Sequence, residues 1–138
     1  FFYCPKASKA ERNRGCEGLE EKQKIFNGQS GKSSKDMKGV EQKFTTQPAN
    51  NNHPTVKPIA LMEYLVKLVS REGQTVLDPF AGSGTTGIAC KNLNRNAILI
   101  EREAEYVEIA KARIDYVKNQ MKSSKNTVNI FFRKEDEL

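Results

Sequence analysis

The fold is decided by residues 75–87, which read TVLDPFAGSGTTG. The first four residues form a short apolar run that ends in Asp78, and a run of this length predicts a buried strand. Residues 82–87 match the pattern G-x-G-x-x-G, and residues 85–93 continue as a helix-forming segment. A strand, a glycine loop and a helix in this order predict a site where the helix N-terminus faces a bound ligand.

The flanking segments continue the alternation of helix and strand. Apolar residues at helical spacing predict a helix over 59–71, which Gly73 ends. After the quoted stretch come an apolar strand over 97–101, a helix over 104–121 and a third strand over 128–132. This order predicts an α/β fold with a parallel sheet and right-handed crossovers.

Residues 5–48 differ in composition from the rest of the chain. They carry ten basic and six acidic side chains among many glycines and small polar residues, and the whole chain has a net charge of +6. Such a segment is typical either of a solvated linker or of a basic surface that contacts phosphates. Residues 17–25 also allow a short helix.

Length and composition exclude several classes of protein. The 138 residues leave room for one domain, and the three cysteines show no C-x-x-C spacing. We therefore expect neither a disulfide scaffold nor a metal site. No apolar run approaches the roughly 18 residues that a membrane-spanning helix needs. The sequence predicts a cytoplasmic protein with no membrane partner.

Two acidic residues discriminate between the nucleoside ligands that the glycine loop can hold. Glu101 ends the second strand 19 residues after Gly82, where a carboxylate can accept hydrogen bonds from a ribose. Asp78 would lie beside the same ligand, and its charge would oppose the pyrophosphate of a dinucleotide. S-Adenosyl-L-methionine instead carries an ammonium and a sulfonium, with one carboxylate that loop N–H groups and the hydroxyls of Thr85 and Thr86 can hold. The charge pattern favours S-adenosyl-L-methionine as the cofactor.

Two motifs together resemble a known family. Residues 78–86, DPFAGSGTT, resemble the cofactor loop of the amino-group DNA methyltransferases, which methylate adenine or cytosine on the exocyclic nitrogen. Residues 52–58, NHPTVKP, resemble the segment that precedes this loop in the permuted class, whose catalytic half comes first. The resemblance covers about residues 50–115. It implies an incomplete Rossmann-like fold of S-adenosylmethionine-dependent methyltransferases, in which residues 50–138 form the C-terminal cofactor-binding half. Residues 1–49 would be the end of a catalytic-half strand and a remnant of the target-recognition region.

The resemblance also implies which residues contact the cofactor. They are Thr55, Lys57, Asp78, Phe80, Gly82, Ser83, Gly84, Thr85, Thr86, Glu101 and Arg102. The first two would help to hold the methionine end, and the next two would line its pocket. The loop from Gly82 to Thr86 would cradle the carboxylate. Glu101 would bind the ribose hydroxyls, and Arg102 would lie beside the adenine.

The catalytic motif of the family is absent from the chain. Family members transfer the methyl group at a tetrapeptide of Asp, Asn or Ser followed by Pro-Pro and an aromatic residue, where the flipped base stacks. The chain has five prolines, and no two are adjacent. We therefore predict no catalytic residue here and no methyl transfer by this chain alone. Its apolar first four residues, FFYC, predict that it is a piece of a longer polypeptide. The resemblance implies that the parent protein is a bacterial or phage-encoded enzyme.

The expected partners follow from the same interpretation. They are double-stranded DNA, the missing N-terminal half of the chain, and a second copy in a homodimer, since two or three strands leave an exposed sheet edge or apolar face. Two alternatives stay open: a non-catalytic DNA-binding module, and half of a nicotinamide-dependent oxidoreductase. His53 is either a turn residue that packs or caps, or a part of the site.

Overall fold

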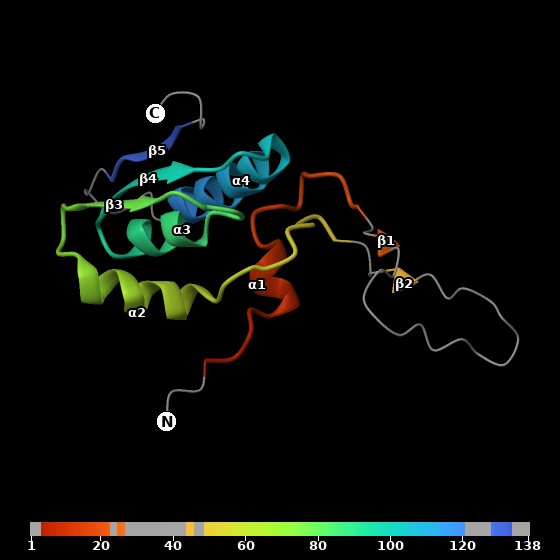
Figure 1. Cartoon of the computed structure of the whole chain (residues 1–138), viewed down its shortest axis with the longest axis horizontal. Helices are drawn as coiled ribbons and strands as arrows, with labels where there is room; N and C mark the ends of the chain where they lie inside the picture. The colour runs from red at the N-terminus through yellow and green to blue at the C-terminus, as the bar shows by residue number, and fades with distance from the viewer. Residues whose placement is uncertain (1–3, 23–24, 27–43, 46–48, 121–127, 134–138) are drawn as a thin grey trace, which may run out of the picture.

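The computed structural model describes residues 4–22, 25–26, 44–45, 49–120 and 128–133 (Figure 1). Its helices and strands alternate in the second half of the chain, as the sequence predicts. In chain order they are α1 Lys9–Asn13, β1 Ile25–Phe26, β2 Phe44–Thr45, α2 Ile59–Val69, β3 Thr75–Asp78, α3 Thr85–Asn92, β4 Asn96–Ile100, α4 Ala104–Gln120 and β5 Ile130–Arg133.

The sheet that carries the site has three parallel strands in the order β3-β4-β5. Thr75 pairs with Asn96 at the start of the first ladder, and Ala97 pairs with Ile130 at the start of the second. Each pair of neighbouring strands is joined through one helix, α3 or α4. The expected parallel sheet with flanking helices is therefore confirmed. Since all three strands run the same way, their carboxyl ends lie at the same end of the sheet.

The core lies around α3 and the central strand β4. Every side chain of α3 from Thr85 to Lys91 is buried, and α2 and α4 both pack against this helix (Figure 1). Ala97 and Leu99 of β4 are fully buried and belong to the same cluster as Ile88 and Ile114. This packing holds the start of α3 against the end of the sheet, where the glycine loop lies.

The prediction that residues 75–78 form a buried strand is wrong about burial. Thr75 and Leu77 are exposed, and the Leu77 side chain keeps 59% of its surface. The reason is that Leu77 is in register with Ile98 of β4, and Ile98 with Phe131 of β5, so that Leu77 lies on the face of the sheet where Phe131 is also exposed, at 55%. In addition, β3 is an edge strand, paired only with β4 among the described residues. Apolar side chains of the neighbouring helix α2 are exposed as well, including Leu68 at 65% and Val69 at 77%. The expected exposed sheet edge and apolar face are thus present.

The N-terminal segment differs from its prediction. Residues 17–22 contain no helix; the helix is α1, which Ser8 caps by accepting a hydrogen bond from the Glu11 N–H. The chain then turns at Gly15, whose φ is +86°, and buries Cys16 completely. A Cβ on Gly15 would lie 2.7 Å from Tyr116 Cβ of α4, so this turn packs directly on the long helix.

The strands β1 and β2 form an antiparallel pair that lies away from the three-stranded sheet (Figure 1). Lys22, which precedes this pair of strands, and Ala49, which follows it, lie next to each other, because they form an isolated antiparallel β-bridge. Among the described residues, no helix is long and apolar enough to cross a membrane.

Candidate functional site

A cavity of about 540 Å³ opens at the carboxyl ends of β3 and β4. Ten of the eleven predicted cofactor residues line it: Thr55, Lys57, Asp78, Phe80, Gly82, Ser83, Thr85, Thr86, Glu101 and Arg102. Gly84 is the exception, because it faces α4 beneath the loop: a Cβ there would lie 2.7 Å from Ala110 Cβ. Five further residues line the cavity: His53, Met62, Ala81, Glu103 and Tyr106.

The glycine loop can follow its path only with glycine at Gly82. This residue has a φ of +52°, a conformation that residues with a Cβ rarely adopt. A Cβ at this position would also lie 2.7 Å from Nε2 of His53. The backbone of the loop is therefore in close contact with the imidazole ring, and the two together form one wall of the cavity.

Asp78 faces the cavity while it holds the loop backbone. Its Oδ1 accepts a hydrogen bond of 3.0 Å from the Phe80 N–H, and its Oδ2 accepts one of 2.5 Å from the Thr86 hydroxyl. A carboxylate oxygen has a second lone pair, so both oxygens can still accept from a ligand. The two protein bonds orient a negative charge at the mouth of the loop.

Glu101 ties the end of β4 to the loop. Its Oε2 accepts from the Gly82 N–H at 2.7 Å, and its Oε1 accepts from the Glu103 N–H at 3.0 Å. The Gly82 N–H is therefore bound within the protein. Among the described residues no acceptor pairs with the N–H of Ser83, which leaves that group as a donor in the loop.

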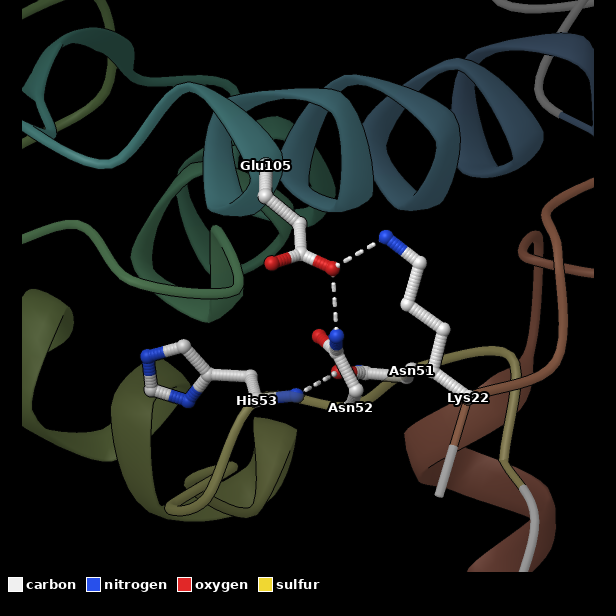
Figure 2. A network of polar contacts seen from close by, with 5 residues as sticks. All are labelled: Lys22, Asn51, Asn52, His53 and Glu105. Atoms are coloured by element: carbon white, nitrogen blue, oxygen red, sulfur yellow. Dashed lines mark hydrogen bonds and ion pairs between the residues drawn. The ribbon is translucent and has the colours of Figure 1, made fainter. Parts of the chain in front are cut away.

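The segment before α2 places His53 against the glycine loop at Gly82. Figure 2 shows His53 with the neighbouring residues that hold this segment. The Asn51 side chain accepts from the His53 N–H at 3.0 Å, and His53 Nδ1 accepts from the Thr55 N–H at 3.3 Å. The imidazole packs edge-on against Tyr106, with 4.4 Å between ring centroids. His53 thus both caps its own turn and lines the cavity, which combines the two roles that the sequence leaves open.

Glu105 of α4 holds the same segment through Asn52, the residue before His53 (Figure 2). Its Oε1 accepts from the Asn52 side chain at 2.5 Å and from Lys22 Nζ at 2.8 Å. The bond to Glu105 raises the pKa of Lys22, which is a surface residue. Glu105 thus links Lys22, at the β-bridge beside the β1–β2 pair, to the segment that carries His53 in the cavity wall.

The N-terminal segment fixes this wall through buried contacts that the sequence does not reveal. The Asn51 side chain is 1% exposed and donates to the Arg12 carbonyl at 2.6 Å. Arg12 in turn donates to the His53 carbonyl at 3.2 Å, and Glu11 accepts from the Ile59 N–H at 2.7 Å. No periodic pattern marks these residues, since each acts on a segment about 40 positions away.

The site holds no reactive thiol. Burial raises the pKa of Cys16 and of Cys90 to about 11, so both are protonated near neutral pH. Among the described residues, no three His, Cys, Asp or Glu side chains gather as metal ligands would. The arrangement offers carboxylates, hydroxyls and N–H groups, which are groups for binding a ligand that carries both signs of charge.

Comparison with known proteins gives a consistent result. The sequence profile described as DNA methylase matches residues 3–112 of the chain. The chain is similar to the Type II methyltransferase M.HpaI of Haemophilus parainfluenzae, with 54% identity over 63 residues, 46% of this chain and 20% of that protein. It is also similar to the Type II methyltransferase M2.DpnII of Streptococcus pneumoniae, with 48% identity over 63 residues, 46% of this chain and 24% of that protein.

Among solved structures, the crystal structure of the M1.HpyAVI-SAM complex shares 56% sequence identity with the chain at a TM-score of 0.44. The match covers 45% of this chain and 31% of that one. The chain thus matches only about a fifth to a quarter of the length of the curated relatives.

Proposed function

The chain belongs to the DNA methylase family, and we propose from this premise that it forms the cofactor-binding part of a DNA methyltransferase. The whole enzyme would transfer a methyl group from S-adenosylmethionine to the exocyclic amino group of adenine or cytosine in double-stranded DNA. The observation that carries the proposal is one cavity at the ends of adjacent parallel strands, lined by Asp78, Glu101 and the glycine loop between them.

The charges around the cavity fit the methionine end of the cofactor. Asp78 offers a carboxylate to its ammonium, and the fixed orientation of that carboxylate removes the cost of ordering it on binding. Ser83 offers a backbone N–H to its carboxylate, near the N-terminus of α3, whose dipole also favours an anion. Thr55 and Lys57 line the same cavity and would hold the methionine end from the opposite segment.

The adenosine end would lie beyond the loop. Glu101 has both oxygens oriented by backbone N–H groups and could accept from the ribose hydroxyls with its remaining lone pairs. Arg102 and Tyr106 line the cavity next to it and offer flat surfaces for an adenine. Phe80 is 85% exposed at the cavity mouth, where it would cover the methionine chain.

The cofactor, when bound, supplies a methyl group on a positively charged sulfur. The described residues of this chain bind and orient that group; they hold no pair of adjacent prolines with an aromatic residue to position a base. We therefore expect the chain by itself to bind S-adenosylmethionine and not to methylate DNA.

Calorimetric titration of the protein with S-adenosylmethionine, with NAD and with duplex DNA tests the proposal. The expected result is binding of S-adenosylmethionine and no binding of NAD, because the Asp78 charge opposes a pyrophosphate. Binding of NAD alone would support the oxidoreductase alternative. Binding of DNA with a steep salt dependence, and of neither small molecule, would support a non-catalytic DNA-binding module.

A further inference from the structure

Arg113 of α4 lies beneath the glycine loop and is buried almost completely, with 1% of its surface exposed. One guanidinium nitrogen, Nη1, donates to three acceptors in the loop: the Ser83 carbonyl at 2.7 Å, the Ser83 hydroxyl at 3.0 Å and the Thr85 hydroxyl at 3.1 Å. Among the described residues no carboxylate forms an ion pair with it, and its Nε and Nη2 atoms have no hydrogen-bond partner.

These contacts determine what the two hydroxyl groups can do. A hydroxyl has one proton and two lone pairs, so an oxygen that accepts from Arg113 keeps its own proton for another partner. Ser83 and Thr85 also line the cavity. Each hydroxyl therefore keeps its proton for a partner other than Arg113, and both residues line the cavity next to the Ser83 N–H. A group of donors backed by a cation suits an anion.

The burial of Arg113 has an energetic consequence. Desolvation lowers the pKa of Arg113, which reflects the cost of keeping this cation in the protein interior. An anion bound on the other side of the loop would offset part of that cost. The opposite charges of Arg113 and Asp78 thus divide the cavity into a part that favours an anion and a part that favours a cation.

We propose that Arg113 is a positioning residue that acts from behind the glycine loop and makes Ser83 and Thr85 donors for the carboxylate of the methionine end of S-adenosylmethionine. This inference rests on the proposed function. Arg113 does not touch the cofactor; it acts through the two hydroxyls and the Ser83 backbone. The sequence alone does not point to it, because it lies 30 residues after Ser83, on the buried face of an ordinary amphipathic helix.

Two ligands isolate the carboxylate. S-Adenosylmethionine and its decarboxylated form share the adenosine, the sulfonium and the amino group, and they differ in the carboxylate. Calorimetry on the wild-type protein should show a clear preference for the carboxylated ligand. The change Arg113→Gln should reduce affinity for that ligand by about tenfold or more, the usual scale for a charged hydrogen-bond network. Affinity for the decarboxylated ligand should stay within about twofold, so that the preference disappears.

Lys111→Gln is the matched control. It removes the same charge from the same helix at an exposed position, where Lys111 pairs with Glu108, and it should leave both affinities unchanged. An equal loss for both ligands in Arg113→Gln would show a merely structural role and overturn the inference, as would an unchanged preference. Binding of neither ligand to the wild-type protein would instead contradict the proposed function.

Ser83→Ala keeps the inference testable if Arg113→Gln does not fold. It removes one hydroxyl. The ratio of the affinities for S-adenosylmethionine and its decarboxylated form should fall by a few-fold, while the affinity for the decarboxylated form stays the same. Where Arg113→Gln does fold, adding Ser83→Ala to it should have little further effect on the preference, because the hydroxyl would no longer be held as a donor. A full preference in Ser83→Ala, or fully additive losses in the double variant, would contradict the proposal.

Discussion

Asp78 and Glu101 each orient the loop backbone and face the cavity at the same time. Both carboxylates accept two hydrogen bonds from the protein, and three of the four donors are backbone N–H groups of residues 80, 82 and 103. These bonds hold the charges before any ligand arrives. At the scale of single residues, the site is therefore a preorganised one, in which binding requires little rearrangement.

We predict that Asp78→Asn removes the negative charge of this side chain while it keeps the hydrogen bonds that hold the loop. The amide oxygen can still accept from the Phe80 N–H, and the amide nitrogen can donate to the Thr86 hydroxyl, so the loop should keep its shape. Loss of the negative charge should weaken S-adenosylmethionine binding by about 10- to 100-fold, and should weaken the decarboxylated ligand similarly, because both carry the ammonium. Calorimetry measures this. Glu108→Gln, an exposed change of the same kind, should have no effect; equal affinities in wild type and Asp78→Asn would refute the role.

A series of glycine variants tests why the loop needs Gly82. Gly18 has neither a positive φ nor a neighbour within 4 Å of its added Cβ, Gly73 has a φ of +79° with open space, and Gly82 has a φ of +52° and His53 at 2.7 Å. Alanine should therefore cost almost nothing at Gly18 and about 1 kcal/mol at Gly73. It should cost about 2–3 kcal/mol at Gly82, where the contact adds to the backbone strain.

Urea unfolding of the three variants measures these differences. The change His53→Ala should remove the steric part, so that Gly82→Ala costs only about 1 kcal/mol in that background. The same cost at Gly82 with and without the imidazole would show that His53 does not press on the loop.

At the scale of elements, α4 is the support on which the site is built. Ala110 contacts the loop at Gly84, Tyr116 contacts the N-terminal turn at Gly15, and Glu105 holds the segment before α2. The N-terminal segment and α4 therefore hold between them the segment before α2, which carries His53. The polar N-terminal segment thus supports the cavity wall through Glu11 and Arg12 without lining the cavity. Its composition alone is equally typical of a solvated linker.

A change at Asn51 tests this clamp, by which we mean the contacts of the N-terminal segment and α4 that hold the segment carrying His53. The change Asn51→Ala would leave the Arg12 carbonyl and the His53 N–H without partners in a buried place. We expect it to lower the free energy of unfolding by about 2–4 kcal/mol, from one or two unsatisfied groups and a small cavity. Urea denaturation gives the value. Asn129→Ala, at an exposed position, should change it by less than about 0.5 kcal/mol; equal costs at the two positions would disprove the clamp.

At the scale of the whole molecule, the described residues include several large apolar side chains that are exposed. They lie on α2, β3 and β5 and in the loop after β3: Tyr64, Leu65, Leu68, Val69, Leu77, Phe80 and Phe131. An edge strand next to such side chains is a surface on which proteins associate.

We predict that the chain of 138 residues self-associates in solution through these exposed apolar side chains. Sedimentation velocity should show a weight-average mass that rises with concentration. The double change Leu68→Glu and Val69→Lys should shift the chain toward monomer, because both side chains are apolar and more than half exposed. The change should leave S-adenosylmethionine affinity as it is, since neither residue lines the cavity. Concentration-independent monomers of the unaltered chain would contradict the prediction.

The order of the elements was predictable from local patterns, and most of the site residues from the family resemblance. The strands, the helices that follow them and the glycine loop come from short-range periodicity, and the parallel pairing of β3 with β4 brings the carboxyl ends of these strands together. Ten of the eleven residues that the resemblance implies around the cofactor line a single cavity there. Burial of β3 was predicted wrongly, because an apolar run does not reveal whether both faces of the sheet are covered.

What the sequence by itself determined is therefore the order of the elements and the edge of the sheet where the charges gather, since both follow from interactions between residues close along the chain. Only the tertiary structure decided that Arg113 lies beneath the loop, that Asn51 joins the N-terminal segment to the cavity wall, and that His53 closes over Gly82. Each of these contacts links residues about 30 to 40 positions apart. Their geometry depends on how whole helices pack, which no local pattern of residue types encodes.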